Sequence, residues 1–280
     1  MSTARICVID LPSLDSMAWR AALADKAVAS GWTYLELWGQ SPPELADDTN
    51  YIILSDAASA QVLDPTAWVV LWGRPASALA SLCSHGEHAL WLASNRLAIG
   101  SEIARAGASV FASDSQCIQL PVIGEVRRAG PAFSTPPGGE VLAFYETLPP
   151  TAGAIARWSS DLFVRPDGRP ASEPIDLTGR RRILAHAPFL ELPPGVWRAT
   201  LRVRIRSPRS SMRLRFEWGP GETVSWVECE EGVSGVYSVV LEATWHERTT
   251  ARLVVWAQIP MFDGEIYIDG AEIEFVSQVD

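Results

Sequence analysis

The chain has 280 residues, of which 48% are hydrophobic and 20% charged, and this length predicts two packed domains of roughly 150 residues each. Its formal net charge of -10 at pH 7 argues against non-specific binding to nucleic acid or to an anionic membrane surface. The apolar runs, such as residues 68–72, are far shorter than the ~20 residues that a membrane-spanning helix needs. We therefore expect a globular protein with neither nucleic acid nor membrane as a partner.

The N-terminus reads MSTARICVIDLPS. One arginine precedes a short apolar run, and neither a secretory hydrophobic region nor a small-residue cleavage site follows it. This pattern predicts a protein that is cytoplasmic at synthesis. Such a chain can still reach the outside of the cell by lysis, as part of a virion-like particle.

The four cysteines, Cys7, Cys83, Cys117 and Cys229, lie far apart and form no CxxC spacing. Neither a zinc site nor a disulfide framework is indicated. We interpret them as small hydrophobic side chains that the core buries.

Residues 1–130 alternate short β-rich runs with helical stretches. Strands are predicted at residues 6–9, 33–38, 51–54, 68–72, 109–112 and 118–123. The longer helices are predicted at residues 16–31, ending at Gly31, and at residues 87–108, with a break near Gly100 as an option. This rhythm is typical of an α/β domain with a largely parallel, Rossmann-like sheet.

Such a sheet favours phosphate at the helix that follows the first strand. Here residues 10–16 read DLPSLDS, and the chain has no GxGxxG or Walker loop. Asp10 and Asp15 have the chemistry to bind a metal or accept a phosphate, and the alternative is that they cap the helix. His85, Glu87 and His88 in CSHGEH offer ligand atoms, but HGEH reverses the metalloprotease order. We predict no metal, no cofactor and no catalytic residue.

A connector is predicted between the two halves. Residues 131–152 contain the runs PAFSTPPGGE and LPPT, and proline and glycine at this density indicate a semi-rigid linker. The expected organisation is therefore an α/β domain at 1–130, a linker at 131–152 and a second domain at 153–280.

The second half changes period. Between residues 197 and 207, apolar side chains alternate with Arg202, Arg204 and Arg206, and residues 212–218 repeat the scheme with Arg213 and Arg215. Further β-rich runs follow at 237–245, 251–259 and 264–276, with turn residues between them and no helical pattern. Strands at this spacing predict an all-β, antiparallel sandwich or jelly roll.

Three stretches carry a family resemblance. The turn LPPGVW (192–197), the run RLVVWAQ (252–258) and the run IYIDGAEIEF (266–275) resemble bacterial carbohydrate-binding modules of the galactose-binding-like jelly-roll type. Residues 176–203 are similar to proteins that handle bacterial surface polysaccharide. Among these are polysaccharide-synthesis enzymes with an appended sandwich and capsule-binding head spikes of phage-like gene transfer agents. The resemblance covers residues 155–277 and implies a jelly roll that binds a glycan.

The final run raises its own question, because Asp269-Gly270 is either the tip of a hairpin or part of one closing strand. We interpret it as one strand, with Ile266, Ile268 and Ile273 facing the core and Tyr267 and Asp269 facing out. Gly270 then marks a bulge or a close approach of another backbone. The family often has a second acid at this position, so a calcium site that uses that acid is not supported here.

Sugar sites pair a flat aromatic ring with planar hydrogen-bonding groups. Alternation places Trp256 and Gln258 on one strand face with Arg252, and Tyr267 and Asp269 join that face if the final strand is adjacent. The competing interpretation is packing of Trp256 against the other domain or a partner subunit. Three other tryptophans are expected in the core, namely Trp197, Trp218 and Trp245. A fourth, Trp226, is expected to be exposed.

The five alternating arginines would create a positive sheet face, where like charges repel. One explanation is ion pairing with the acidic last third of the chain, for example Glu242, Glu272 and Glu274. The other is an anionic glycan, since guanidinium groups bind carboxylates and phosphates in bidentate fashion. On the second interpretation Arg202, Arg204 and Arg215 join the predicted glycan site, and the run Arg180–Arg182 adds to it.

The leading hypothesis is a non-catalytic protein for cell attachment. Its sandwich binds a bacterial capsular or exopolysaccharide, and the α/β domain docks to a larger assembly such as a virion-like head spike, with a homo-oligomer raising avidity. The alternative is an enzyme of polysaccharide synthesis or modification with a catalytic α/β domain. A third possibility is a structural subunit whose sandwich makes only protein contacts.

Overall fold

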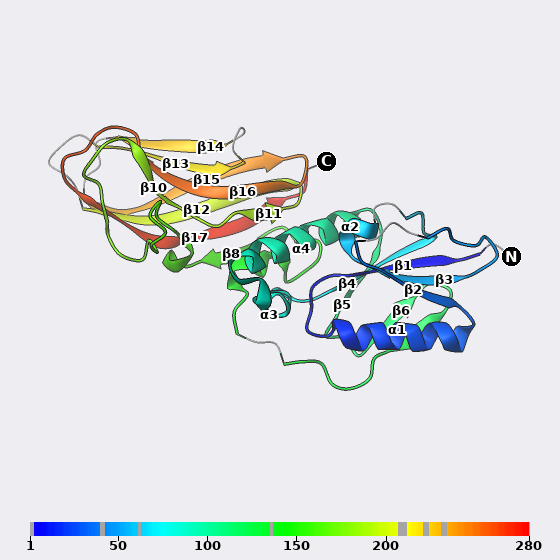
Figure 1. Ribbon diagram of the computed structural model, residues 1–280. Coiled ribbons are helices and arrows are strands. Elements are labelled where there is room, and N and C mark those ends of the chain that lie inside the picture. The colour runs from blue at the N-terminus through cyan, green and yellow to red at the C-terminus, as the bar shows by residue number, and fades with distance from the viewer. Residues whose placement is uncertain are drawn as a thin grey trace. The chain divides into compact units, whose positions relative to one another are not determined.

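The computed structural model describes residues 3–39, 43–60, 63–134, 137–206, 212–220, 224–230 and 234–279 (Figure 1). The chain divides into two compact units. An N-terminal unit comprises Met1–Gly139 and Tyr145–Pro149, and a C-terminal unit comprises Glu140–Phe144 and Pro150–Asp280. Among the described residues, no helix has both the length and the apolar character to cross a membrane.

The N-terminal unit is built on a five-stranded parallel sheet of order β2-β3-β1-β4-β5. Its strands are β1 (Arg5–Asp10), β2 (Thr33–Leu37), β3 (Tyr51–Ser55), β4 (Ala67–Trp72) and β5 (Ser109–Ala112). The predicted parallel sheet is confirmed. Its order is not the Rossmann order, in which strands 3, 2, 1 and 4 are successive neighbours.

Helices cover both faces of this sheet, with α1 (Ser16–Ser30) on one face and α4 (Ala89–Arg105) on the other (Figure 1). Helix α1 buries Trp19, Leu23 and Ala27 against the sheet, because residues three or four apart share one helix face. The helix ends, as predicted, at Gly31, whose left-handed φ of 69° suits a glycine cap.

Helix α4 continues through Gly100 without a break, so the optional break was wrong. A Cβ atom at Gly100 would lie 2.4 Å from Leu11 Cδ1, and the glycine therefore allows close packing. The predicted strand at 118–123 is also shorter. It forms β6 (Cys117–Leu120), which turns and pairs antiparallel with β7 (Gly124–Arg127) in a separate two-stranded sheet.

The remaining helical elements are short. They are α2 (Ala57–Ala60), α3 (Pro75–Ser81) and three 3-10 helices: η1 (Cys83–His88), η2 (Glu140–Tyr145) and η3 (Ser160–Leu162). Helix η2 lies inside the stretch 131–152 that the sequence predicts as a linker. Of the cysteines, Cys7 is buried as expected, whereas Cys83 is exposed, contrary to the prediction.

The C-terminal unit is a sandwich of two antiparallel sheets, which confirms the predicted all-β domain. The β17 sheet has the order β15-β12-β17-β8, with β9 also paired to β17; its strands are β8 (Ala154–Trp158), β9 (Ile175–Asp176), β12 (Gly195–Arg206), β15 (Gly235–Trp245) and β17 (Glu265–Ser277). The β16 sheet has the order β10-β16-β13-β14, with β11 also paired to β16; its strands are β10 (Arg182–His186), β11 (Leu190–Leu192), β13 (Arg213–Gly219), β14 (Ser225–Glu230) and β16 (Thr249–Ala257).

Aromatic side chains fill the space between the two sheets. Trp197, Trp218 and Trp245 are buried, as the sequence predicts. Their rings meet edge to face, with centroids 6.3 Å apart for Trp197 and Trp245 and 5.5 Å apart for Trp218 and Trp245. Such pairs are worth about 0.5–1.5 kcal/mol beyond their buried area, so this cluster fixes how the two sheets face each other.

Candidate functional site

The run 264–276 forms one continuous strand, β17, and not a hairpin. The pairing register with β12 shifts between Ile268 and Gly270, so Asp269 is the extra residue of a bulge. Gly270 has φ of 119°, and a Cβ atom there would lie 2.5 Å from the Trp158 carbonyl oxygen. The interpretation of Gly270 as a bulge and close approach is confirmed, as is the burial of Ile266, Ile268 and Ile273.

The expected adjacency of the last two strands is wrong. Strand β16 belongs to one sheet and β17 to the other. Because the sheets pack face to face, their outer faces point in opposite directions. Tyr267 and Asp269 therefore do not join the face that carries Trp256 and Arg252.

The expected positive face is wrong for the same reason, since β12 and β13 also lie in different sheets. Most of these arginines are paired with acids from the last third of the chain. The guanidinium nitrogen to carboxylate oxygen distances are 2.9 Å for Arg204–Asp269, 3.3 Å for Arg206–Glu265, 2.7 Å for Arg213–Glu230 and 2.8 Å for Arg215–Glu217. Ion pairing, the first of the two explanations, is thus confirmed for these four residues. The acids that the sequence suggested as examples pair with other arginines instead: Glu242 and Glu274 with Arg198, and Glu272 with Arg157.

The outer face of the β17 sheet holds the other predicted residues. Arg204 and Arg206 lie 4.8 Å and 5.1 Å from the centroid of the Tyr267 ring. The hydrogen bonds from Arg204 to Asp269 raise the pKa of the guanidinium. Arg202 and Asp269 line a groove of about 740 Å³ on this unit. In the described part of the chain Arg202 makes no ion pair within 4.0 Å, in contrast to its neighbours on β12.

The outer face of the β16 sheet presents a connected set of aromatic and charged side chains. Trp256 lies opposite Arg215 in the strand register, and its indole Nε1 donates to Glu217 Oε2 at 2.9 Å. Arg215 lies 2.8 Å from Glu217 Oε1 and 4.6 Å from the ring centroid of Trp226. Trp226 is 51% exposed, as the sequence predicts. The Glu217 carboxylate therefore contacts the half-buried Trp256 indole directly and the arginine that lies over the exposed Trp226 ring.

A second aromatic–arginine pair extends this face. Arg252 lies 5.5 Å from the ring centroid of Phe189, which is 44% exposed. The His186 ring also lies near Phe189, with the two ring centroids 6.1 Å apart. We call the set Phe189, Arg215, Glu217, Trp226, Arg252 and Trp256 the β16 platform. Gln258 follows β16 and is half-buried beyond the end of the platform.

The glycan site predicted from the sequence lacked three members of the platform, although one of them, Trp226, was expected to be exposed. Glu217 had a signal, because alternation places it on the same strand face as Arg215. Phe189 had none, since it lies just before β11 and approaches Arg252 only through the pairing of β11 with β16. The distance between Trp226 and Trp256 also depends on the fold. Two interstrand spacings and a two-residue offset separate their backbones by about 12 Å.

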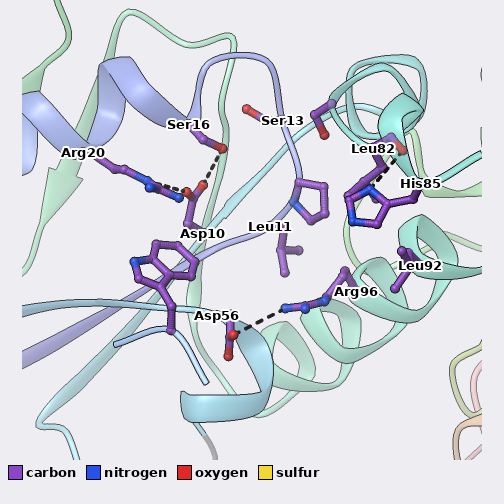
Figure 2. A pocket seen from close by; sticks show the side chains of 13 residues that line it. Asp10, Leu11, Ser13, Ser16, Arg20, Asp56, Leu82, His85, Leu92 and Arg96 are labelled. Carbon is purple, nitrogen blue, oxygen red and sulfur yellow. Dashed lines mark hydrogen bonds and ion pairs between the residues drawn. The ribbon is translucent and has the colours of Figure 1, made fainter. Parts of the chain in front are cut away.

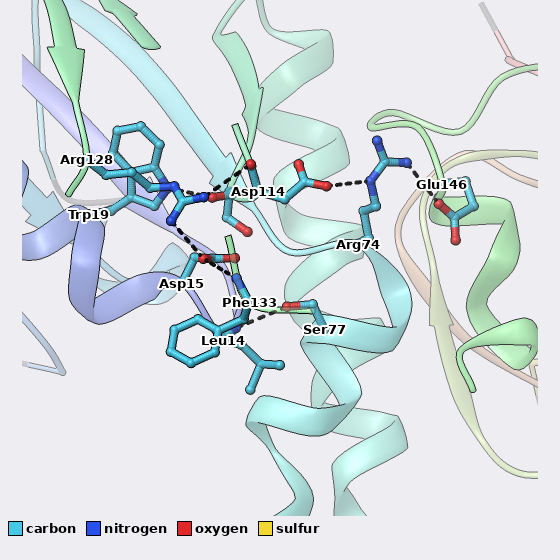
Figure 3. A network of polar contacts seen from close by, with 10 residues as sticks. Leu14, Asp15, Trp19, Arg74, Ser77, Asp114, Arg128, Phe133 and Glu146 are labelled. Carbon is cyan, nitrogen blue, oxygen red and sulfur yellow. Dashed lines mark hydrogen bonds and ion pairs between the residues drawn. The ribbon is translucent and has the colours of Figure 1, made fainter. Parts of the chain in front are cut away.

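The predicted acids of the N-terminal unit have different roles. Asp10 lines a pocket at the end of β1 (Figure 2). Asp15 makes no side-chain capping hydrogen bond, so the helix-cap alternative is wrong for it. Its carboxylate lies 3.3 Å from Arg128 Nη1 and accepts a hydrogen bond from the Phe133 amide (Figure 3). Asp15 thus ties the segment after β7 to the β1–α1 turn.

The candidate metal ligands do not converge. His85 and His88 are both exposed in η1, and His85 Nδ1 lies 3.2 Å from the Leu82 carbonyl oxygen. The side chain of Glu87 lies outside the described residues. Within the described residues, no three His, Cys, Asp or Glu side chains are grouped so that they could hold a metal ion.

Of three comparisons with known proteins, only the one with solved structures found similar proteins. No family model matches the chain, and no curated protein sequence matches it. The carbohydrate-binding module TmCBM61 in complex with beta-1,4-galactotriose is 15% identical with a TM-score of 0.29, over 35% of this chain and 66% of the module. The CBM22-1 xylan-binding domain of Xyn10C from Paenibacillus barcinonensis is 9% identical with a TM-score of 0.29, over 46% of this chain and 99% of the domain.

A longer match is the Glycosylation Associate Protein (Gap123) complex from Streptococcus agalactiae. It is 10% identical with a TM-score of 0.30, over 87% of this chain and 50% of that chain. Carbohydrate-binding modules are thus among the solved structures to which this chain is similar.

Proposed function

We propose that the C-terminal sandwich binds a polysaccharide through the β16 platform. The observation that carries this proposal is the pair of exposed rings, Trp226 and Phe189, each lying against a guanidinium group on one sheet face. A sugar ring presents apolar C–H groups to an aromatic face and hydroxyl groups to planar donors and acceptors. The platform supplies both kinds of contact on one open surface.

The finer proposal is that the ligand is a bacterial capsular or exopolysaccharide and that the protein is not an enzyme. The resemblance of residues 176–203 to proteins that handle bacterial surface polysaccharide supports this ligand class. The same resemblance supports docking of the N-terminal unit to a larger assembly, such as the head spike of a virion-like particle, in cell attachment. Shallow single contacts are weak, and display as a homo-oligomer would raise avidity by ~100-fold or more.

The test is retention of the full chain on a panel of neutral and acidic bacterial polysaccharides in affinity electrophoresis. We expect Trp226→Ala and Trp256→Ala to weaken binding by roughly tenfold or more, because each removes aromatic contact area. Trp91→Ala is the matched control, since Trp91 is 40% exposed in α4 of the other unit.

Two further variants separate the faces. Tyr267→Ala and Arg202→Ser alter only the outer face of the β17 sheet, and we expect both to bind like the wild type. Loss of binding in these two, with binding kept in the Trp226 variant, would move the site to the β17 sheet. A wild-type protein that no polysaccharide of the panel retains would contradict the proposed function.

A further inference from the structure

A pocket of about 300 Å³ opens in the N-terminal unit at the carboxyl ends of β1 and β3 (Figure 2). Strand β1 connects through α1 to β2, which lies on the β3 side of β1 in the sheet, whereas β3 connects through α2 to β4 on the opposite side of β1. Open parallel sheets bind ligands where the direction of the connections reverses. The polysaccharide platform lies in the other unit and makes no use of this pocket.

Two arginines reach the pocket from different helices, Arg20 from α1 and Arg96 from α4 (Figure 2). Arg20 Nε lies 3.8 Å from Asp10 Oδ2, and Arg96 Nη1 lies 3.8 Å from Asp56 Oδ2. Both distances exceed hydrogen-bond range. Arg20 Nε is buried and has no hydrogen-bond partner in the described part of the chain. The Arg20 and Arg96 side chains are 32% and 33% exposed, so their solvent-facing parts can contact a ligand.

The same pocket offers acceptors. Asp10 Oδ1 accepts a hydrogen bond from Ser16 Oγ at 3.0 Å, and Asp56 Oδ1 accepts one from the Ser59 amide at 2.6 Å. The second oxygen of each carboxylate faces an arginine across the 3.8 Å gap. The apolar part of the lining includes Leu11, Leu92 and Trp38. The pocket thus combines cationic donors, anionic acceptors and an apolar wall.

We propose that this pocket binds a small hydroxylated oxyanion, a sugar phosphate or a sugar acid. Arg20 and Arg96 hold the anionic group, because guanidinium forks match phosphate and carboxylate oxygens. Asp10 and Asp56 accept hydrogen bonds from the hydroxyl groups, and Trp38 covers the carbon skeleton. The volume lies at the small end of ligand pockets, so one monosaccharide-sized molecule fits and a polymer does not.

The electrostatics of the pocket depend on Asp10. Burial raises the pKa of Asp10 to about 6, against the opposing effects of the Ser16 hydrogen bond and the Arg20 charge. The charge of Glu36 on β2 acts in the same direction as burial. The other charged or titratable groups that line the pocket are Asp56, His85 and Arg96. Below about pH 6 Asp10 is neutral, and the arginines then leave the site positive. We therefore expect oxyanion binding to weaken as pH rises through this value.

The experiment is isothermal titration calorimetry of the full chain with four probes: glucose 1-phosphate, glucuronate, glucose and inorganic phosphate. We expect glucose 1-phosphate or glucuronate to bind at least about tenfold more tightly than glucose and inorganic phosphate. The order of the two anions identifies phosphate or carboxylate as the preferred group. Arg96→Gln should weaken this binding by roughly tenfold or more. Arg127→Gln is the control, because Arg127 pairs with exposed Glu125 outside the pocket.

The pH profile provides a second, independent readout. Asp10→Asn should remove most of the pH dependence of binding, since asparagine has no ionisable carboxyl group. His85→Gln is measured in parallel as a control, because His85 also lines the pocket. Arg96→Lys, which keeps the charge and loses the fork, guards against a variant that fails to fold. All pocket variants should keep polysaccharide retention, which separates this proposal from the proposed function.

Three results would overturn the proposal. One is the absence of heat with both glucose 1-phosphate and glucuronate at millimolar concentration. Another is equal affinity of wild type and Arg96→Gln for the anion that binds. The third is inorganic phosphate binding as tightly as glucose 1-phosphate, which would leave Asp10 and Asp56 without a hydroxyl group to bind.

Discussion

The β16 platform and the N-terminal pocket contain the same three kinds of side chain in different surroundings. On the platform, Arg215 lies 4.6 Å from the Trp226 ring centroid and 2.8 Å from Glu217. In the pocket, Arg20 lies 4.3 Å from the Trp38 ring centroid and 3.8 Å from Asp10. The platform arginine forms a short ion pair within the sheet face, whereas the pocket arginine lies beyond hydrogen-bond distance of its carboxylate.

This difference follows from where each set lies in its fold. Cross-strand neighbours on the outside of a sandwich meet at fixed spacing, so opposite charges there close into short pairs. Side chains at the carboxyl ends of parallel strands surround a crevice, and their partners come from separate helices. A flat face with exposed rings suits an extended polymer, and a concave charged crevice suits a small molecule.

The largest effect is expected from breaking the buried pair of Asp15 and Arg128 (Figure 3). Their side chains are only 3% and 1% exposed, and Arg128 also donates to the carbonyl oxygens of Ser115 and Pro131. Removing one partner of a buried pair costs about 3–5 kcal/mol. Asp15→Asn should therefore lower the free energy of unfolding of the N-terminal unit by this amount, measured by hydrogen–deuterium exchange of α1 peptides in urea.

The control for this prediction is Arg127→Ala, which breaks the exposed Arg127–Glu125 pair and should change stability by no more than about 1 kcal/mol. Equal effects of the two variants would show that burial does not distinguish these pairs. Polysaccharide retention should survive Asp15→Asn, since the platform lies in the other unit.

A smaller effect is expected from Asp10. Its pKa is raised to about 6 by burial, so the folded state binds a proton more tightly than the unfolded state does. The stability contributed by Asp10 is then fully present below about pH 4 and is lost as pH rises through about 6. Asp10→Asn should stabilise the N-terminal unit by about 1–3 kcal/mol at pH 7.5 and have little effect below pH 4. Thermal unfolding across this pH range checks the sign, and a variant that is less stable at pH 7.5 would contradict it.

The smallest effect is expected on the platform. Glu217 contacts both Trp256 and Arg215, and Glu217→Gln removes the charge that holds Arg215 beside Trp226. Polysaccharide affinity should fall by roughly three- to tenfold, about 1 kcal/mol. Glu230→Gln is the matched control, because it breaks the Arg213–Glu230 pair of the same sheet and touches no aromatic ring in the described residues. Equal losses in both variants would indicate that net charge, not the aromatic arrangement, governs binding.

Several features could be predicted from local pattern. Alternation identified the outward face of β12, the outward face of β16 and the core position of Trp218. Gly270 was identified as a bulge because glycine tolerates a positive φ that other residues rarely adopt. The end of α1 at Gly31 could be predicted because glycine also tolerates the left-handed φ of a helix cap.

The pairing of those strands could not be predicted in the same way. Consecutive strands β12 and β13, and likewise β16 and β17, lie in different sheets, and alternation says nothing about which sheet a strand enters. The residues that the sequence predicted on one glycan-binding face therefore lie on the two opposite outer faces of the sandwich. The platform contains Phe189, Glu217 and Trp226, which the predicted glycan site lacked, and it excludes Tyr267 and Asp269.

By itself, the sequence determined the two classes of secondary structure, the faces that each strand turns inward and the residues that pack the core, because periods of two and 3.6 are local properties of the backbone. Tertiary structure decided which faces meet. It also decided which arginines lie at hydrogen-bond distance from a carboxylate oxygen, at 2.9 Å, and which lie farther away, at 3.8 Å. Those distances depend on strand order and helix placement, and contacts between residues far apart in the chain set both.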